Sequence, residues 1–402
     1  MMRGRLIGVL GVLMAALAAE AHVFSLSCKV TALNGDFGTA EGRARTVAWC
    51  RRNGMTKLWL ELYRHAERVP TARLVEVRDA FRKEGFAVSG MITPTQLNDS
   101  KSMVCCWTDP KACARLAEET VRAASVFEEI IFDDFLFTDC QCARCQAEQK
   151  RRGFKDRGAF RCALLQEVCE TCILKPGRAA NPKVQFIIKY PCWWQRYKSR
   201  GYDPVAEAKL FGKCWVGTET RDENPNPLQA CWIMDWMDRV TEGRCGGGWY
   251  DPLKIADPSK FVEQARYTIL GGARESIVHC YDYLLADDPG KAAFNESMKG
   301  RKACAAAFAA ESNGLRTLAE TLEGATRGPF AMETNRVSRH AFTKGAVRYE
   351  AFQNTSGKAA ELKASFVGHK VLALPAAESA ALQEDGTVLL RPHALLLIRE
   401  TP

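Results

Sequence analysis

The chain has 402 residues, of which 47% are hydrophobic and 26% charged, with a formal net charge of +9. This length and composition are enough for a sizeable core and suit one large domain plus a small one. The positive charge is spread out in short clusters such as Arg151-Arg152, so we expect no nucleic-acid partner.

Residues 1–21 are predicted to be an export signal. Arg3 and Arg5 supply a positive start, Leu6 to Ala18 is apolar, and Ala19-Glu20-Ala21 fits the small-x-small cleavage pattern. The apolar run is too short for a stable membrane span, and no later segment reaches the roughly 18 to 20 apolar residues that a span needs. We therefore expect a protein without a membrane span, located in the periplasm or secreted.

Strand and helix patterns alternate from residue 22 to about 325. Apolar runs predict strands at Val23–Val30, Lys57–Tyr63, Phe86–Ile92, Glu129–Phe137, Val184–Tyr190, Lys213–Thr218, Gly246–Tyr250 and Ser276–Tyr283. Amphipathic stretches predict helices at Thr71–Glu84, Cys113–Val126, Pro227–Val240, Pro258–Leu270 and Ala292–Leu322. Eight strands, each followed by a helix, is the count of a (β/α)8 TIM barrel. A doubly wound open sheet is the alternative, although a Gly-x-Gly-x-x-Gly motif after the first strand is missing.

The pattern changes after Gly324. Strand signals separated by turn residues occur at Val347–Asn354, Glu361–Phe366, Val371–Leu374 and Val388–Arg399. We therefore expect an α/β protein with a barrel domain over residues 22–325 and a small antiparallel, β-sandwich-like domain over 328–402.

Two adjacent carboxylates, Asp133 and Asp134, end the fourth predicted strand. The C-terminal ends of barrel strands form the face where barrel enzymes keep their chemistry. Side chains alternate along a strand, so only one of the two is expected to point fully into the barrel mouth. We choose Asp134 as the catalytic residue because it lies nearer that face, and Asp133 as its electrostatic neighbour.

Further acids, bases and aromatic residues follow the other strand ends. Glycoside hydrolysis needs one carboxylic acid to protonate the leaving oxygen and a second carboxylate as nucleophile or base. Glu219 is the predicted partner of Asp134, since Gly217 and Thr218 leave space around it, and Arg221 is expected to orient it. The remaining predicted substrate-binding residues are Glu61, Tyr63, Arg64, Lys189, Tyr190, Trp193, Trp249, Asp251 and Asp282. The expected partner is a carbohydrate, and no cofactor is expected.

Several of these stretches resemble secreted bacterial glycoside hydrolases of an uncharacterised family with a (β/α)8 barrel. They are Leu-Glu-Leu-Tyr-Arg (60–64), Ile-Ile-Phe-Asp-Asp-Phe-Leu-Phe-Thr-Asp-Cys-Gln-Cys-Ala-Arg-Cys (130–145), Ile-Ile-Lys-Tyr-Pro (187–191), Gly-Thr-Glu-Thr-Arg-Asp (217–222) and Gly-Gly-Gly-Trp-Tyr-Asp (246–251). The Asp-Asp pair followed by Cys-x-Cys-x-x-Cys also looks like a feature of barrel glycosidases of the β-galactosidase type. The resemblance covers about half the chain and implies a glycosidase of undefined substrate.

The chain has seventeen cysteines, an odd number that leaves at least one thiol free or paired between chains. Export permits disulfides, and we expect at least two, one of them within Cys140–Cys145. In a second interpretation, Cys140, Cys142 and Cys145 hold a structural zinc ion with a fourth ligand from Cys105, Cys106 or Cys113.

Two functions compete with a glycosidase. A barrel hosts many activities, so a non-catalytic carbohydrate-binding protein would share the fold. A polysaccharide lyase or deacetylase is the third candidate, with Lys189 and Tyr190 as base and acid. The separation of the carboxyl groups is the feature of a structure that bears most directly on a glycosidase mechanism.

Overall fold

The computed structural model describes residues 21–98, 102–221, 228–286, 300–363, 370–372 and 380–400. Residues 1–20 of the expected export signal lie outside these ranges, as do 292–299 of one predicted helix and the last residues of two predicted strands, 364–366 and 373–374. Among the described helices, none is both long and apolar enough to cross a membrane.

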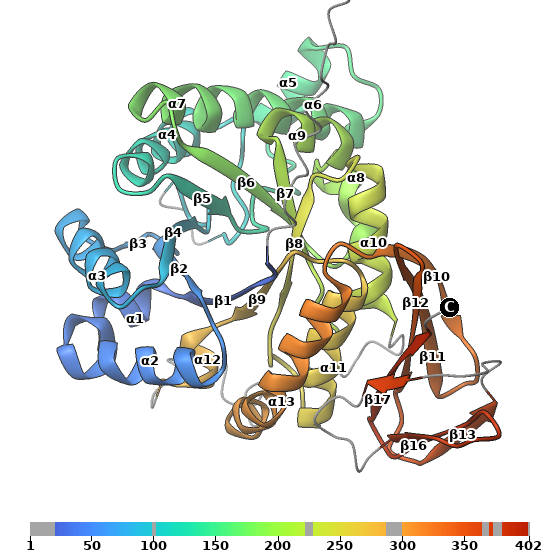
Figure 1. Ribbon diagram of the computed structural model, residues 1–402. Coiled ribbons are helices and arrows are strands. Elements are labelled where there is room, and N and C mark those ends of the chain that lie inside the picture. The colour runs from blue at the N-terminus through green and yellow to red at the C-terminus, as the bar shows by residue number, and fades with distance from the viewer. Residues whose placement is uncertain are drawn as a thin grey trace, which may run out of the picture.

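Eight parallel strands close into a barrel surrounded by helices (Figure 1). The strands are β1 (Val23–Cys28), β2 (Lys57–Arg64), β4 (Ala87–Ile92), β5 (Glu129–Phe132), β6 (Gln185–Tyr190), β7 (Lys213–Gly217), β8 (Cys245–Tyr250) and β9 (Glu275–His279). Each pairs in parallel with the next one in this order, and β9 pairs in parallel with β1. The predicted (β/α)8 barrel is confirmed, and the closure excludes the open sheet. A two-residue strand, β3 (Glu67–Arg68), adds to β2 in antiparallel fashion.

Helices follow the strands and cover the outside of the barrel. They are α1 (Val30–Asn34), α2 (Ala40–Arg52), α3 (Thr71–Lys83), α4 (Pro110–Ala124), α5 (Ala143–Arg151), α6 (Arg157–Val168), α7 (Lys175–Ala180), α8 (Tyr197–Arg200), α9 (Pro204–Phe211), α10 (Gln229–Val240), α11 (Pro258–Leu270), α12 (Tyr281–Leu284) and α13 (Arg301–Leu322), with shorter helical turns η1 (Asp36–Gly38), η2 (Cys169–Leu174) and η3 (Trp194–Arg196). Aspartates begin several of them: the side chains of Asp109, Asp156, Asp203 and Asp257 accept backbone N–H bonds at the starts of α4, α6, α9 and α11.

Two predicted strands run four or more residues past the ends of the real ones. The fourth ends at Phe132 and the eighth at His279, although apolar and aromatic residues continue beyond both points. After Phe132 the chain turns, with the Phe135 N–H donating to Asp133 O, and Tyr281 begins α12. The apolar residues past these ends therefore pack in a turn after β5 and in α12 after β9, and hydrophobicity alone does not distinguish these from strand.

The inside of the barrel is filled in layers. An apolar layer at mid-height consists of Trp59, Met91, Ile131, Ile187, Trp215, Trp249 and Ile277. Below it, towards the strand N-termini, Lys57 pairs with Glu129 and Glu275 at 2.5 Å and 3.0 Å. Above it lie the carboxylates described in the next subsection. This filled interior means that chemistry is confined to the open end of the barrel.

The triple glycine 246–248 belongs to strand β8, where it makes room for a neighbouring ring. A Cβ atom on Gly247 would lie 1.5 Å from Nε1 of Trp215, so only glycine fits there. The Trp215 ring in turn packs edge-on against Trp59, with ring centroids 6.2 Å apart. The glycines thus allow three tryptophans, counting Trp249, to fill the mid-height layer.

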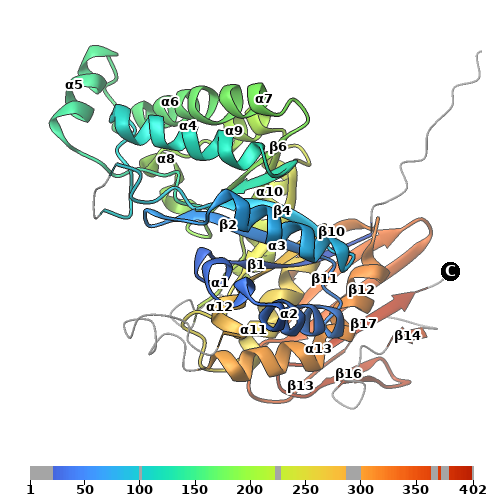
Figure 2. The same cartoon turned by 90° about the vertical axis from the view of Figure 1, so that its left-hand side faces the viewer.

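The residues after α13 form two antiparallel sheets beside α11 and α13 (Figures 1 and 2). One contains β10 (Thr326–Met332), β11 (Val337–Lys344), β12 (Val347–Asn354), β17 (Leu395–Glu400) and β14 (Lys370–Leu372), and the other β13 (Ala360–Lys363), β16 (Thr387–Leu390) and β15 (Ala380–Leu382). The predicted antiparallel fold of this region is confirmed. The single strand predicted at Val388–Arg399 is wrong: it is two strands, β16 and β17, separated by a turn in which Ala394 N–H donates to Arg391 O.

The cysteines form no disulfide with one another in the part of the chain that the structure describes. The disulfide expected within Cys140–Cys145 is not formed, and no second one occurs among the described residues. Most of these thiols are buried, Cys28, Cys214 and Cys280 among them, where they pack as small apolar side chains.

Candidate active site

Charged side chains from most barrel strands gather at the C-terminal end of the barrel. The acids are Glu61, Asp133, Asp134, Glu219, Asp251 and Asp282, and the bases are Lys29, Arg64, Lys189 and Arg221. All the acids except Asp134 are buried. Because acids outnumber bases in a poorly hydrated place, the cluster favours keeping a proton on one carboxylate.

Lys189 is the centre of this cluster. Its Nζ lies 2.8 Å from Asp134 Oδ2, 3.3 Å from Asp133 Oδ1 and 3.4 Å from Glu219 Oε1. The lysine reaches up from β6 with its ammonium 4.7 Å from the centroid of the Trp249 ring. Burial opposes its charge, but the three carboxylates outweigh burial and hold the pKa of Lys189 well above its ordinary value. The lysine therefore stays protonated and fixes the three carboxylates around one point.

Asp133 is held on several sides. Besides Lys189, Arg64 Nη2 donates to its Oδ2 at 3.0 Å, and the Asp134 N–H donates to its Oδ1 at 2.9 Å. Burial alone would raise the pKa of Asp133, but the charges of Lys189 and Arg64 outweigh burial and lower it. A carboxylate so well supplied with donors stays ionised, which suits the predicted role of electrostatic neighbour.

Asp134 differs from Asp133 although the two are adjacent. The strand ends at Phe132, so strict alternation no longer applies, and both side chains reach Lys189. The side chain of Asp134 is 18% exposed, against 5% for Asp133. Burial, with the charges of Asp133 and Glu219, raises its pKa to about 6 despite Lys189. Asp134 is thus the acid best placed to hold and deliver a proton near neutral pH.

Glu219 has one oxygen engaged and one without a partner. Oε1 faces Lys189, whereas Oε2 is buried and accepts no hydrogen bond from the described residues. A Cβ on Gly217 would lie 2.2 Å from Oε2, so the glycine predicted to leave space here does so. A buried carboxylate oxygen without a donor is costly, and a bond to a bound molecule would relieve that cost.

Glu61 and Arg64 connect Asp133 to the first strands. Arg64 Nε donates to Glu61 Oε1 at 2.7 Å, and the Val30 N–H donates to Glu61 Oε2 at 3.2 Å. The Thr93 hydroxyl lies 2.5 Å from Glu61 Oε1 and 3.2 Å from Asp133 Oδ2, so its single proton is shared between the two carboxylates. All oxygens of Glu61 are therefore used inside the protein, and Glu61 acts by holding Arg64 in place.

Arg221 was expected to orient Glu219, but its hydrogen bond goes to Asp251. Nη2 donates to Asp251 Oδ2 at 2.8 Å, and the Leu253 N–H donates to the other oxygen at 3.0 Å. Arg221 interacts with Glu219 only through its charge. Burial raises the pKa of Asp251 against the opposing charge of Arg221.

Four predicted substrate-binding residues are not placed for direct contact. Tyr190 points outwards into the layer between strands and helices, because it alternates with the inward Lys189 along β6. Tyr63 also points outwards although it is in phase with the inward Trp59, because the pairing of β2 with β4 shifts register between Glu61 and Tyr63. Trp249 is 1% exposed and forms the floor under Lys189. Asp282 accepts from the Lys29 N–H at 3.0 Å and from the Thr31 hydroxyl, which fixes the chain after β1. The predicted Trp193 is placed differently: it is half-buried and lies beside Phe137, with ring centroids 5.1 Å apart.

Three residues at this end were not predicted: Thr93 at the end of β4, His279 at the end of β9 and Lys29 after β1. His279 is buried, and burial lowers its pKa well below the ordinary value, so the ring is neutral and shares a 2.7 Å hydrogen bond between Nδ1 and Ser27. Reading the strand ends for every strand, including the first and third, would have identified them.

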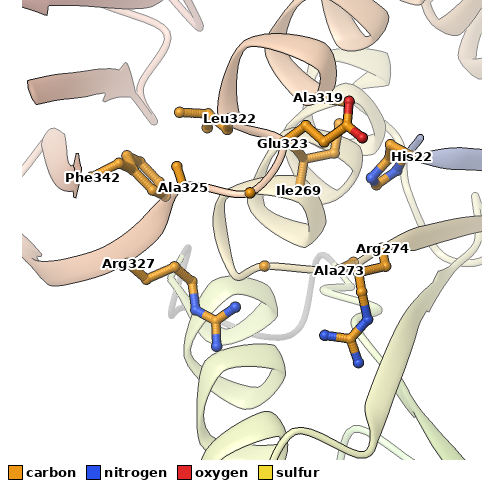
Figure 3. A pocket seen from close by; sticks show the side chains of 12 residues that line it. His22, Ile269, Ala273, Arg274, Ala319, Leu322, Glu323, Ala325, Arg327 and Phe342 are labelled. Atoms are coloured by element: carbon orange, nitrogen blue, oxygen red, sulfur yellow. The ribbon is translucent and has the colours of Figure 1, made fainter. Parts of the chain in front are cut away.

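A separate pocket lies at the opposite end of the barrel (Figure 3). His22 precedes β1 and Arg274 precedes β9, so this pocket opens near the N-terminal ends of the strands. Its Arg327 is neutralised by Asp235 at 3.0 Å and Asp238 at 2.5 Å. Among the described residues that line it, Glu323 is the single acid, so the C-terminal end, with Asp134 and Glu219, is the candidate active site.

Comparison with known proteins identifies a family for the barrel region. The family described as "Probable glycosyl hydrolase, catalytic domain" matches residues 14–324. An uncharacterized protein of Saccharolobus solfataricus is 22% identical over 227 residues, 49% of this chain, and the match spans only 37% of that relative's length.

Several solved structures share the fold. A cold-adapted β-galactosidase from Rahnella superposes with a TM-score of 0.62 at 7% identity, covering 95% of this chain and 98% of the other. An α-amylase from Geobacillus thermoleovorans gives 0.54 at 10% identity, covering 94% and 98%. The PgaB glycoside hydrolase domain from Bordetella bronchiseptica gives 0.50 at 9% identity, covering 72% and 98%. At such low identities these likenesses establish the barrel fold alone.

Proposed function

This chain belongs to the family of probable glycosyl hydrolase catalytic domains, and from that premise we propose that it cleaves a glycosidic bond in an oligo- or polysaccharide with Asp134 and Glu219 as its working pair. The observation that carries the proposal is the shared contact of both carboxylates with Lys189 at the open end of the barrel. Paired carboxylates with unequal environments are the requirement of this reaction.

Asp134 is the proposed general acid. With its pKa raised to about 6, it is mostly protonated below that pH and still holds its proton in roughly a tenth of molecules at pH 7, and its side chain is the most exposed of the carboxylates around Lys189. It donates its proton to the glycosidic oxygen as the bond from that oxygen to the anomeric carbon breaks. The resulting Asp134 carboxylate then takes a proton from water in the second step.

Glu219 is the proposed nucleophile. The oxygens of Asp134 and Glu219 that contact Lys189 lie 2.8 Å and 3.4 Å from it, so these two oxygens are at most about 6 Å apart, a range that includes the roughly 5–5.5 Å between the carboxyl groups of retaining enzymes. This supports a two-step reaction: a Glu219 oxygen bonds to the anomeric carbon as the leaving alcohol departs, and water then displaces Glu219 with net retention.

Aromatic side chains beside Asp134 provide a surface for sugar rings. Phe135 and Phe137 are half-buried, with ring centroids 6.0 Å apart. The Phe137 ring in turn packs against the ring of Trp193. Rings of this kind bind sugar faces at small entropic cost. The row supports a substrate with more than one sugar unit.

The lyase or deacetylase alternative loses support from the positions of its two proposed catalysts. Lys189 is surrounded by carboxylates that keep it protonated, so it is a poor base. Tyr190 is fully buried on the other side of the strand, and burial raises its pKa well above the ordinary value. A carbohydrate-binding protein without activity is distinguished from a hydrolase by the following experiment.

The purified protein should be assayed against aryl glycosides and polysaccharides of varied sugar and linkage. We expect hydrolysis of at least one of them, and the product released first should keep the anomeric configuration of the substrate when followed by NMR. Binding of a polysaccharide without turnover would favour the binding protein instead, and a product of opposite configuration would overturn the nucleophilic role of Glu219.

The pH dependence of that hydrolysis is expected to respond to Lys189. A general acid must be protonated, so kcat/KM should fall as the pH rises through about 6, the pKa of Asp134. The charge of Lys189 lowers that pKa, so Lys189→Met should raise it and move the alkaline limb of the pH profile to higher pH. Lys198→Met, at a side chain 71% exposed, is the control. If a folded Lys189→Met protein kept the alkaline limb at the wild-type pH, Asp134 would not be the general acid that sets this limb.

A further inference from the structure

Four cysteines meet beside the candidate active site, although they come from two loops and a helix. Cys106 lies in the loop between β4 and α4, Cys140 and Cys142 lie in the loop after β5, and Cys145 lies in the first turn of α5. Their sulfur atoms all lie within 4.8 Å of one another. Figure 2 shows α5 projecting beyond the other helices, so this cluster joins a protruding segment to the barrel.

The distances between the sulfur atoms fit a metal ion. Cys106 Sγ lies 3.5 Å from Cys145 Sγ and 3.7 Å from Cys142 Sγ. Four sulfurs at about 2.3 Å from a tetrahedral zinc ion are separated by about 3.8 Å. A disulfide requires about 2.05 Å between two sulfurs, and pairing any two cysteines would leave the mutual closeness of all four unexplained.

The surroundings of the cluster suit thiolates. The Thr108 hydroxyl lies 3.1 Å from Cys106 Sγ and 3.3 Å from Cys145 Sγ, where it can donate to a metal-bound sulfur. Cys142 is the N-cap residue of α5, so the positive end of that helix dipole faces the cluster. The charge of Arg144 interacts with both Cys106 and Cys142.

We propose that Cys106, Cys140, Cys142 and Cys145 bind one structural zinc ion. The four thiols lose their protons to solvent on binding, and the site is closed because all four positions are filled by protein. Four thiolates select a soft divalent ion such as zinc over magnesium or calcium. The inference does not depend on the glycosidase proposal, because it concerns the binding of an ion rather than a reaction.

The ion would hold together the two loops that border Asp134, the one between β4 and α4 and the one after β5. These loops already share two hydrogen bonds, from Trp107 Nε1 to Leu136 O at 2.6 Å and from the Thr138 hydroxyl to Cys105 O at 2.9 Å. Leu136 and Thr138 follow Asp134 within four residues. A zinc ion bound beside these two hydrogen bonds would fix the position of the loop that carries Asp134, the proposed acid.

The metal content of the full-length protein tests the proposal. The wild type, purified without chelator, should contain one zinc ion per chain by elemental analysis. Cys106→Ser and Cys142→Ser should lose it, and Cys142→Ser is expected to fold because Cys142 is exposed. Cys113→Ser is the matched control: its thiol lies on the same side of the barrel but donates to Trp107 O at 3.4 Å.

Two further measurements make the result specific. Cobalt in place of zinc should give the intense absorption bands of a tetrahedral tetrathiolate site in the wild type and Cys113→Ser, but not in Cys106→Ser. A strong chelator should lower the thermal unfolding midpoint of the wild type and of Cys113→Ser, but not that of Cys106→Ser. Protein without metal whose intact mass shows disulfides among the four cysteines would overturn the proposal, as would a zinc content that none of the cysteine variants changes.

Discussion

Glu219→Gln is expected to lower kcat/KM by at least about 10²-fold, the lower range for losing a positioned catalytic group. The substitution preserves the size of the side chain but replaces an anionic oxygen with a neutral amide, which cannot form the bond to the anomeric carbon. Lys189 keeps Asp133 and Asp134 as partners, so the fold should survive. Initial rates on the best substrate from the screen, with circular dichroism as a check of folding, measure the effect.

Two comparisons separate a nucleophile from a merely structural carboxylate. Glu242→Gln changes a side chain that is 61% exposed and should retain full activity. Glu219→Ala with added azide should release a glycosyl azide of inverted configuration, because azide then attacks from the side that Glu219 has left. Near wild-type turnover by folded Glu219→Gln would show that this residue is not catalytic.

The barrel could be predicted from the sequence because its strands are buried on both faces and read as short apolar runs. Ile130–Phe132 and Phe186–Ile188 are examples, and both are fully or almost fully buried. Strand ends were less predictable, since Phe135 and Leu136 continue the apolar pattern in a loop. There the chain turns because Asp133 is fixed by Arg64 and Lys189, contacts between distant segments that no local pattern records.

The sequence predicted those residues of the candidate site that lie at the C-terminal ends of barrel strands. Asp133, Asp134, Lys189 and Glu219 were found by that rule, and the structure brings them together. The roles of Arg221 and Trp249 could not be predicted, because they depend on which partner lies across the barrel. Arg221 bonds Asp251 rather than Glu219, and Trp249 is covered by Lys189.

The four-cysteine cluster was also only partly predictable from the sequence. The spacing Cys140-x-Cys142-x-x-Cys145 indicates either a metal site or disulfides, and the composition of the chain cannot choose between them. The fourth cysteine is distant in sequence and is brought in only by the packing of two barrel loops. Cys105, Cys106 and Cys113 are equivalent candidates in sequence, but only Cys106 joins the cluster.

Asp134→Asn is expected to reduce turnover as strongly as Glu219→Gln, but only on substrates whose leaving group needs a proton. The amide cannot donate a proton to the glycosidic oxygen, so kcat/KM on a natural glycoside should fall by at least about 10²-fold. On a dinitrophenyl glycoside, whose leaving group departs as a stable anion, the loss should be much smaller. The alkaline limb near pH 6, set by the pKa of Asp134, should also disappear.

Asp139→Asn is the matched control for Asp134→Asn, because Asp139 lies on the same loop and its side chain is 50% exposed. It should leave the rate and pH profile unchanged. Losses of equal size on the natural and the dinitrophenyl substrate would show that Asp134 does not act as the proton donor. Asp251→Asn would then be the next variant to test, because burial raises the pKa of Asp251 as well.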